Sequence, residues 1–351
     1  MTKEAYNVIG VMSGTSLDGI DLVYATLIPL DWRYNCIHCD TFPYPKKWHR
    51  ELQESVDFNE EQLKDLDQAY TEFLADTILT FIKKYTIVDI DAVCSHGHTI
   101  LHQPEHSLTY QIGNRPELAS LIEQNVVCDF RVKDVELGGQ GAPLVPIGDR
   151  LLFSQYTYCL NLGGFANVSF ENDLKRTAFD ICPVNIVMNH YSRALGFDYD
   201  DKGLLAASGV IDSELLKELN SMSYYSQKPP KSLGLEWVKE KIFPVIDSYE
   251  LPTEDILRTF VEHISVQICK IFTNQGSVLI TGGGAYNDFL MRRIKEISDC
   301  DIILPSTEII EFKEALIFGL LGVLKLRNEV NCLSSVTGAL RDHSSGNIFK
   351  P

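Results

Sequence analysis

The chain has 351 residues, and 48 acidic residues against 31 basic ones give it a formal net charge of −17 at pH 7. Surfaces that bind nucleic acid or anionic membranes need clustered Lys and Arg, so this balance argues against both kinds of partner. A hydrophobic fraction of 45% over this length predicts about two domains, each with a core of its own.

The N-terminal and cysteine patterns favour a cytoplasmic protein. The start MTKEAYN lacks the basic region of a signal peptide, and the longest apolar run, residues 315–324, is far shorter than the roughly 18 residues of a membrane span. Nine cysteines are scattered along the chain, and Cys36 and Cys39 form one Cys-x-x-Cys without a second pair. We therefore interpret the cysteines as reduced and mostly buried.

The first predicted element is a β-hairpin over residues 8–28, in which two apolar runs flank the turn SGTSLDG at residues 13–19. The glycines let backbone N–H groups approach a ligand, Thr15 and Ser16 add hydroxyl donors, and Asp18 adds a carboxylate that can hold a cation. This chemistry suits a polyphosphate with its metal ion. An ordinary hairpin with a polar glycine turn explains the same residues equally well.

Residues 59–84 predict a long amphipathic helix beside a sheet, because apolar residues recur at every third or fourth position. A buried strand over residues 92–95 follows and delivers a polar loop with several histidines, among them His96 and His98. Loops at the carboxyl ends of strands bind ligands in open α/β sheets, so we interpret this loop as substrate-contacting. A metal site on the histidines, or loop histidines without a function, are the alternatives.

Residues 137–146 are rich in glycine, bounded by proline and without the period of a helix or strand. A loop of this length is either functional or a linker. We therefore predict an N-terminal domain over residues 1–132 and a C-terminal domain over residues 133–351, with the C-terminal segment free to pack back on the first domain. Arg131 and Lys133 are the first basic residues placed there to face an anionic substrate.

Glycine turns recur twice in the second half of the chain. Residues 156–170 predict a second hairpin around Gly163 and Gly164, and residues 277–287 predict a strand, three glycines and the start of a helix. Neither a Walker-type P-loop nor a Gly-x-Gly-x-x-Gly turn between strand and helix occurs. Two hairpins and one such turn are the layout of actin-like, sugar-kinase-like ATPases with a ribonuclease H-like fold, in which two α/β domains close on a nucleotide.

A carboxylate in the second half is a candidate general base. Residues 177–180 look like the end of a strand that presents Asp180, and a helix opens after it toward Leu195. Such a carboxylate, in a cleft between domains, is well placed to accept a proton, although a capping or turn aspartate explains the segment equally well. Residues 198–209 are expected to be loops, and residues 255–273 and 312–327 to be packing helices.

These motifs together resemble, nearly from end to end, the anhydro-N-acetylmuramic acid kinases of bacterial cell-wall recycling. No single motif is decisive, but their shared order is specific. The motifs in the family's order are SGTSLDGID at 13–21, SHG at 95–97 with Thr99, QIGN at 111–114, DFR at 129–131, GGQGAPLVP at 138–146, NLGGFAN at 161–167, FD at 179–180, AASG at 206–209, PKS at 230–232, GGGAYN at 282–287, EA at 314–315 and VTGA at 336–339.

The resemblance implies a kinase that uses ATP and Mg²⁺ to phosphorylate O6 of anhydro-N-acetylmuramic acid while water opens its 1,6-anhydro ring, giving N-acetylmuramic acid 6-phosphate. The intact anhydro sugar has no free 6-hydroxyl, so a base must activate water for attack at C1 as O6 departs toward the γ-phosphate. By the resemblance Asp180 is that base. The resemblance also implies a homodimer.

The resemblance further assigns the ligand contacts, with Asp18 near Mg²⁺ and Arg131 pairing with the lactyl carboxylate of the sugar. The β- and γ-phosphates would be held by Gly14, Thr15, Ser16, Leu17, Asp18, Gly19 and Asp21, and closed over by Gly163 and Gly164, with Gly282, Gly283 and Gly284 beside the adenosine. The sugar contacts would be Ser95, His96, Thr99, Arg131 and Gln140.

Several positions depart from the family's pattern. Cys182 and Val184 stand at usually small positions, Asn189 stands where an aspartate is common, and His98 replaces a usual glutamine. These changes bear on sugar specificity and rate rather than on the fold. The alternative function is a catalytically weak sensor that binds ATP and a muramyl sugar, and a weaker third is a metallohydrolase built on His96 and His98.

Overall fold

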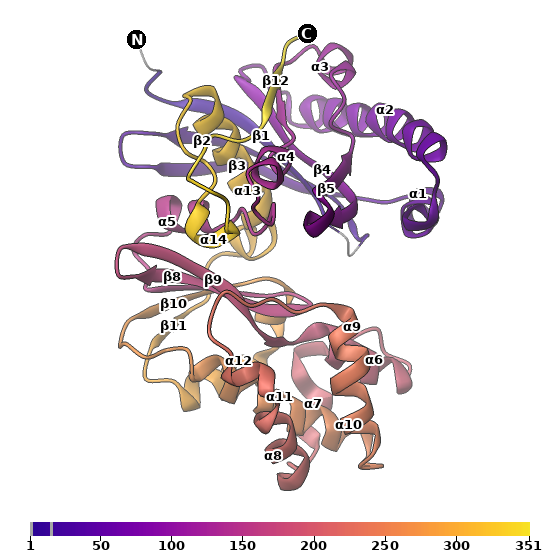
Figure 1. The fold of residues 1–351 in the computed structure, drawn as a ribbon, viewed down its shortest axis with the longest axis vertical. Coiled ribbons are helices and arrows are strands. Elements are labelled where there is room, and N and C mark those ends of the chain that lie inside the picture. Colours follow the sequence, from indigo (N-terminus) through magenta and orange to yellow (C-terminus); the bar gives the residue numbers. More distant parts are fainter. Residues whose placement is uncertain (1–2, 15–16) are drawn as a thin grey trace. The chain divides into compact units, whose positions relative to one another are not determined.

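The computed structural model describes residues 3–14 and 17–351, which form two compact units (Figure 1). Unit 1 comprises Met1–Leu152 and Phe312–Pro351, and unit 2 comprises Phe153–Glu311. The division after residue 152 differs from the predicted boundary after residue 132. Residues 133–152 belong to unit 1 because Asp134 accepts a hydrogen bond from Thr337, and Asp149 pairs with Lys313 at 2.7 Å.

Unit 1 is built on a seven-stranded sheet with the order β12-β6-β4-β1-β2-β3, in which β5 pairs with β4. The strand β1 pairs antiparallel with β2 and parallel with β4, so that Ser13 at the end of β1 lies opposite His98. The strands are β1 (Tyr6–Ser13), β2 (Gly19–Ile28), β3 (Arg33–Pro43), β4 (Ala92–Gln103), β5 (Leu108–Ile112), β6 (Val126–Cys128) and β12 (Asn347–Phe349).

Helices pack on both faces of this sheet. The predicted long helix is confirmed as α2 (Glu60–Tyr85), whose first turn is closed by a capping box between Asn59 and Gln62. On the other face, a Cβ at Gly10 would collide with the Ala315 carbonyl of α13 (Thr307–Leu326), so glycine permits this close approach. The other helices of unit 1 are α1 (Lys46–Glu54), α3 (Glu117–Ile122), α4 (Val132–Glu136), α5 (Pro146–Leu152) and α14 (Ser334–Thr337).

Unit 2 is built on a five-stranded sheet with the order β11-β10-β7-β8-β9. Its strands are β7 (Tyr158–Leu162), β8 (Phe165–Asn172), β9 (Lys175–Pro183), β10 (Ser277–Thr281) and β11 (Asp301–Ile303). Its helices are α6 (Asn185–Ala194), α7 (Leu204–Ser208), α8 (Ser213–Ser221), α9 (Leu235–Trp237), α10 (Phe243–Asp247), α11 (Thr253–Cys269) and α12 (Asp288–Ile297). Apolar residues of α11 and of the central strands share one buried core.

The two sheets repeat one topology. In unit 1 the antiparallel strands β3-β2-β1 are followed by the parallel strands β4 and β6, and in unit 2 β9-β8-β7 are followed by β10 and β11. Each unit therefore begins with a hairpin and adds parallel strands beside the first strand of that hairpin. The predicted two-domain α/β class is confirmed, with the same strand arrangement in both units.

Three local predictions are wrong. Within residues 198–209, which were expected to be loops, Leu204–Ser208 form the helix α7. The segment that carries His96 and His98 is not a loop but part of β4, because residues 98–103 pair with β5 in a second hairpin. Asp180 does not end its strand, because β9 continues to Pro183, whose partner on β8 is Phe165. In β4 and β9, pairing with a neighbouring strand extends the strand beyond the residue at which the local sequence predicts its end.

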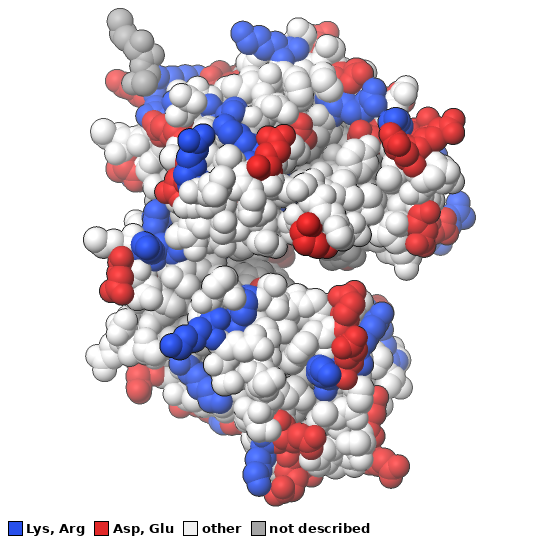
Figure 2. Space-filling model, in the orientation of Figure 1, with Lys and Arg blue, Asp and Glu red and all other residues white. Residues whose placement is uncertain are grey.

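The surface carries charge of both signs. Over the described residues visible in Figure 2, acidic and basic side chains lie among one another. Within the part of the chain that the structure describes, no helix has both the length and the apolar composition needed to cross a membrane.

Candidate functional site

Unit 2 contains a cavity of about 660 Å³ at the carboxyl end of β10, which is the size of a small-molecule site. It opens beside the three-glycine turn and the first residues of α6 and α12. Its lining mixes apolar and aromatic side chains with amides and charges. The lining residues are Asn185, Met188, Asn189, Tyr199, Asp200, Asp201, Lys202, Gly283, Ala285, Tyr286, Asn287, Asp288, Leu304 and Ile310.

Two neighbouring glycines of this turn differ in the space around them: a side chain at Gly282 would clash, and one at Gly283 would not. Gly282 has φ +83°, and a Cβ there would lie 2.6 Å from Asn161 Oδ1 and 2.8 Å from the Leu162 carbonyl. At Gly283, by contrast, the nearest atom to an added Cβ is Asn185 Nδ2 at 3.9 Å. Gly282 thus lets the turn lie against β7, and Gly283 leaves backbone accessible from the cavity.

The second hairpin turn lies at the same sheet edge as this glycine turn. Thr281 on β10 is the register partner of Asn161 on β7, and Gly163 and Gly164 follow directly. The Gly164 carbonyl accepts hydrogen bonds from the N–H groups of Val184, at 2.8 Å, and Ile186, at 3.3 Å. The structure therefore brings two of the predicted nucleotide-binding glycine groups to one edge of unit 2 and attaches the start of α6 to them.

Asp180 lies on β9, where its backbone is held from both sides. Its N–H donates to the Lys231 carbonyl at 3.2 Å, and its carbonyl accepts from the Tyr224 hydroxyl at 2.6 Å. Its Oδ2 accepts from the Leu233 N–H at 2.9 Å, whereas no partner is found for Oδ1 among the described residues. Partial burial raises the pKa of the Asp180 carboxyl, and the Leu233 hydrogen bond opposes that shift only in part. One oxygen is thus fixed and the other remains available to a proton.

In unit 1, the predicted residues His96 and Arg131 are in contact. Arg131 Nε donates to His96 Nε2 at 2.9 Å, and Arg131 Nη1 donates to the Gly141 carbonyl at 2.8 Å. His96 Nδ1 lies 2.9 Å from the Gly97 carbonyl, so Nδ1 carries the proton and the imidazole is neutral. Burial, reinforced by the Arg131 charge, holds the pKa of His96 well below its usual range.

The guanidinium of Arg131 keeps its charge in this setting. Partial burial lowers the pKa of Arg131 to about 10, which still leaves the group protonated at neutral pH. Its Nη2 has no hydrogen-bond partner among the described residues, since Nε and Nη1 make the two contacts above. One edge of a fixed cation is therefore available to an anionic ligand.

His98 belongs to a different hydrogen-bond chain. Its Nδ1 lies 2.7 Å from Ser13 Oγ, which contacts the Tyr44 hydroxyl at 2.6 Å, and Tyr44 in turn contacts the Tyr70 hydroxyl at 2.6 Å. This chain fixes the end of β1 against β4 and α2, directly before the first hairpin turn. Burial lowers the pKa of His98 to about 4, so the ring is neutral near pH 7. Each histidine thus has a hydrogen-bonding role of its own, which leaves the paired metal site without support.

The other predicted sugar-contacting residues differ in exposure. Ser95 is buried, and its Oγ accepts from the Gly97 N–H at 3.1 Å. The Thr99 hydroxyl is buried without a hydrogen-bond partner among the described residues. Gln140 is exposed, and its backbone N–H donates to the Thr337 carbonyl at 2.8 Å. Thr99 is the one of these three with a buried hydroxyl left to bind a ligand.

The first hairpin turn is described in part. Thr15 and Ser16 lie outside the described residues; Leu17 has φ +61°, and its N–H donates to the Gly14 carbonyl at 3.3 Å. Asp18 is exposed on this turn. A carboxylate there fits Mg²⁺, which takes one or two protein oxygens and otherwise binds water and phosphate.

Beyond that turn, β2 supports the two remaining predicted residues of this group. A Cβ at Gly19 would lie 2.5 Å from the Phe42 carbonyl, and Asp21 Oδ1 accepts from Thr41 Oγ1 at 2.6 Å. Both residues are thereby held against β3. Gly19 allows the close approach of two strands, so the absence of a side chain there has a packing reason beside any role with phosphate.

Sequence reasoning missed most of the cavity and one central carboxylate. Asn185, Tyr199, Lys202 and Tyr286 line the cavity, but nothing in their spacing marked them. Asp134 is fully buried and was not predicted, although it directly follows the basic residues Arg131 and Lys133. The only signal in the sequence was that Asp134 lies just before the glycine-rich residues 137–146. A buried carboxylate at such a place can accept hydrogen bonds from the backbone N–H groups of the loop.

Comparison with known proteins gives one consistent family. The model of the family described as anhydro-N-acetylmuramic acid kinase matches residues 6–351. A relative of that description from Pseudomonas syringae pv. tomato is 36% identical, with 86% of this chain and 85% of the relative covered. One from Sulfurimonas denitrificans is 33% identical, with 97% and 99% covered.

Among solved structures, the activator of the 2-hydroxyisocaproyl-CoA dehydratase from Clostridium difficile, with bound ADPNP, aligns at a TM-score of 0.44. It is 12% identical and covers 92% of this chain and 96% of its own. Family membership rests on the family model over residues 6–351 and on the sequence relatives.

Proposed function

The chain belongs to the anhydro-N-acetylmuramic acid kinase family, and from this premise we propose that it phosphorylates O6 of anhydro-N-acetylmuramic acid with ATP while water opens the 1,6-anhydro ring. It is accordingly a sugar kinase. The observation that carries the mechanism is Asp180, with one carboxylate oxygen held by Leu233, the other unpartnered among the described residues, and a raised pKa.

In the proposed reaction, Asp180 takes a proton from water as the water oxygen forms a bond to C1. The C1–O6 bond breaks, and O6 forms its new bond to the γ-phosphorus of ATP, from which ADP departs. One water and one ATP are consumed, and the new hydroxyl stays on C1. A carboxyl with a raised pKa binds this proton more strongly than an ordinary aspartate does, which favours it as the base.

We propose that unit 1 supplies the sugar contacts through Ser95, His96, Thr99, Arg131 and Gln140. Arg131 is suited to the lactyl carboxylate because it is charged, tethered at two nitrogens and open at Nη2. A tethered guanidinium loses less freedom on binding an anion than an exposed one does. The unpartnered Thr99 hydroxyl is suited to a sugar hydroxyl.

We propose that ATP binds through both hairpin turns and the unit 2 cavity. Gly14, Thr15, Ser16, Leu17, Asp18, Gly19 and Asp21 would serve the phosphates from unit 1, and Gly163 and Gly164 from unit 2. Gly282, Gly283 and Gly284 would lie beside the adenosine, whose size suits the cavity of about 660 Å³. Mg²⁺ held by Asp18 would neutralise charge on the transferring phosphoryl group.

The same proposal places the enzyme in the cytoplasm, where recycled cell-wall sugar meets ATP, and treats it as a homodimer. Light scattering of the purified enzyme tests the homodimer. A mass of one chain, 39.6 kDa, contradicts that part of the proposal and leaves the chemistry unaffected.

The decisive experiment is turnover in ¹⁸O-labelled water with Mg-ATP and anhydro-N-acetylmuramic acid, followed by mass spectrometry of the sugar product. We expect a sugar phosphate with one label at C1. An unlabelled phosphate ester would indicate phosphorylation of a free hydroxyl, as in a simple sugar kinase. Binding of both ligands without any product would favour the sensor function and overturn the proposal.

A further inference from the structure

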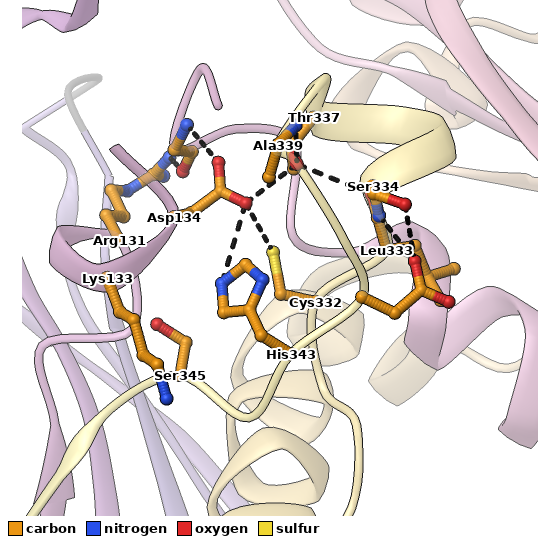
Figure 3. Close-up of polar contacts among 12 residues, drawn as sticks. Arg131, Lys133, Asp134, Cys332, Leu333, Ser334, Thr337, Ala339, His343 and Ser345 are labelled. Atoms are coloured by element: carbon orange, nitrogen blue, oxygen red, sulfur yellow. Dashed lines mark hydrogen bonds and ion pairs between the residues drawn. The ribbon is translucent and has the colours of Figure 1, made fainter. Parts of the chain in front are cut away.

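Three side chains that the kinase reaction does not use converge in the core of unit 1. Asp134 lies on α4, while Cys332 and His343 come from the two ends of the segment that follows α13 (Figure 3). Asp134 is 0% exposed, Cys332 1% and His343 6%, and their ligand atoms all lie within 4.8 Å of one another. A carboxylate, a thiol and an imidazole at this spacing are the ligand types of a zinc site.

The hydrogen bond at Nδ1 of His343 holds its ring in the way that is usual for a metal-binding histidine. Its Nδ1 lies 3.1 Å from the Arg341 carbonyl, so Nδ1 donates and the lone pair of a neutral ring is on Nε2. A backbone carbonyl holding the other ring nitrogen is the common second contact of a zinc-bound histidine. Nε2 points toward Asp134 Oδ1, which lies 3.6 Å away and beyond hydrogen-bonding length.

That nitrogen is buried without a hydrogen-bond partner among the described residues. Leaving such a group unsatisfied in the core costs about 1–3 kcal/mol, so a buried orphan nitrogen that faces a carboxylate needs an explanation. The hydroxyls of Ser344 and Ser345, next in the chain, are also buried without partners in the described structure. A cation bound by Nε2 would satisfy this nitrogen, whereas Asp134 Oδ1 already accepts from Thr337 Oγ1 and Cys332 Sγ.

The distances within the cluster suit a tetrahedral ion. Cys332 Sγ lies 3.0 Å and His343 Nε2 3.6 Å from Asp134 Oδ1. Bonds of about 2.3 Å to sulfur and 2.0–2.2 Å to nitrogen and oxygen place the ligand atoms of a tetrahedral zinc roughly 3.3–3.8 Å apart. Small movements of side chains would therefore form the site. Thr337 Oγ1, which donates to Asp134 Oδ1 at 2.7 Å, would orient the carboxylate from outside.

We propose that Asp134, Cys332 and His343 bind a zinc ion, with water as the fourth ligand. As the S–Zn bond forms, the Cys332 thiol releases its proton to solvent, and the thiolate and carboxylate together balance the 2+ charge. A thiolate and an imidazole select a borderline-soft ion over the hard Mg²⁺ that accompanies ATP. The site is thus chemically distinct from any cation held by Asp18.

The ion would have a structural role close to the proposed sugar contacts. Asp134 Oδ2 accepts from the Gly141 N–H at 2.7 Å, and the Gly141 carbonyl accepts from Arg131. Zinc on the same carboxylate would therefore join α4, the glycine-rich loop and the C-terminal segment at one point. Its removal is expected to loosen Arg131 without touching the nucleotide cavity of unit 2.

The test is metal analysis of the full-length enzyme, purified without chelator or nucleotide and dialysed against metal-free buffer. We expect about one zinc ion per chain, and less than about a tenth of that in Cys332→Ala and His343→Ala. Cys128→Ala is the matched control, because Cys128 is an equally buried thiol of unit 1 outside the cluster. Wild-type zinc content in Cys332→Ala would overturn the proposal.

A second measurement applies if the variants fold poorly. Metal-free wild-type enzyme is titrated with Co²⁺, and we expect a thiolate-to-cobalt charge-transfer band in the near ultraviolet that saturates at about one equivalent and disappears when Zn²⁺ is added. Zinc should also raise the thermal midpoint by roughly 5 °C. Absence of zinc together with absence of the cobalt band would show that the cluster is held by hydrogen bonds alone. Neither result depends on whether the enzyme phosphorylates its proposed sugar.

Discussion

The two units of this protein place different chemistry at the same position of the same sheet. In each, one parallel strand lies beside the first strand of the hairpin: β4 in unit 1 and β10 in unit 2. The strand β4 has 12 residues and continues into a hairpin that buries His96 and His98, whereas β10 has 5 residues and stops at the glycine turn. At this position, the long strand β4 buries a polar cluster, whereas the short strand β10 ends at an open cavity.

The hairpin turns differ in the same way. In unit 1, Asp18 presents an exposed carboxylate directly before β2, and unit 2 connects β7 to β8 through Gly163 and Gly164 alone. A long turn supplies side chains, and a two-glycine turn supplies backbone. The repeated sheet provides two equivalent scaffolds, and the residues at the strand ends determine what each can bind.

Asp180→Asn should have the largest effect, because it removes the proposed base of unit 2 and leaves the cavity intact. General-base assistance is worth about 10²- to 10⁴-fold, so we expect kcat to fall by that factor while the Kd for ATP is unchanged. Asp173→Asn, at the exposed tip of the same β8–β9 hairpin, is the control and should keep wild-type kcat. Unchanged turnover in Asp180→Asn would remove this residue from the role.

Gly283→Val tests whether the cavity of unit 2 is the nucleotide site. An added Cβ at residue 283 makes only an ordinary contact, with Asn185 Nδ2 at 3.9 Å, so we expect the fold to tolerate the side chain and the KM for ATP to rise about 10- to 100-fold from overpacking against the ligand. The KM for the sugar should change little. A wild-type KM for ATP would place the adenosine elsewhere.

The neighbouring substitution Gly282→Ala is the matched contrast. At φ +83°, with a Cβ 2.6 Å from Asn161 Oδ1, it should destabilise unit 2 by about 1–3 kcal/mol, as measured by denaturant unfolding. Gly283→Val is thus expected to weaken ATP binding, and Gly282→Ala is expected to lower stability. Equal loss of stability in both variants would contradict the distinction between them.

Arg131→Lys addresses the corresponding region of unit 1. Lysine keeps the charge but loses the fork that holds both His96 and Gly141, so we expect the KM for the sugar to rise about 10-fold with the KM for ATP unchanged. Lys133→Arg is the control, since Lys133 donates to the Ser344 carbonyl from an exposed position. An increase in the KM for ATP of equal size would contradict the assignment of Arg131 to the sugar.

The sequence predicted the scaffold better than it predicted the site. Hairpins, the long helix α2 and the glycine turns leave strong local signals, because apolar periodicity and glycine spacing arise from the elements themselves. Strand ends leave weaker signals. The histidine segment reads as a loop until β5 pairs with it, and Asp180 looks terminal until β8 extends β9 to Pro183.

The remaining site residues depend on contacts between distant segments. Tyr199 and Lys202 lie in a stretch expected to be loop, and they meet Tyr286 only because the chain returns through β10. Asp134 and His343 are 209 residues apart in the sequence and meet inside unit 1. Neither group of residues has a local sequence pattern from which its contacts could be predicted without the fold.

His98→Gln is expected to have the smallest effect and is measured as a change of stability with pH. The pKa of His98 in the folded protein is about 4, below the ordinary 6.5, so the unfolded chain takes up a proton that the native state does not. Its contribution to stability is therefore full above pH 6.5 and is lost as the pH falls toward 4.

Glutamine at residue 98 removes this contribution. At pH 5.5 the difference in unfolding free energy between wild type and variant should shift by about 1 kcal/mol relative to pH 8. His96 and His263, also buried with lowered pKa values, act in both proteins and cancel in the comparison. His106→Gln, at an exposed position, is the control substitution. Parallel profiles for His98→Gln and wild type would show that folding leaves the pKa of His98 unchanged, which would contradict its burial as a neutral ring.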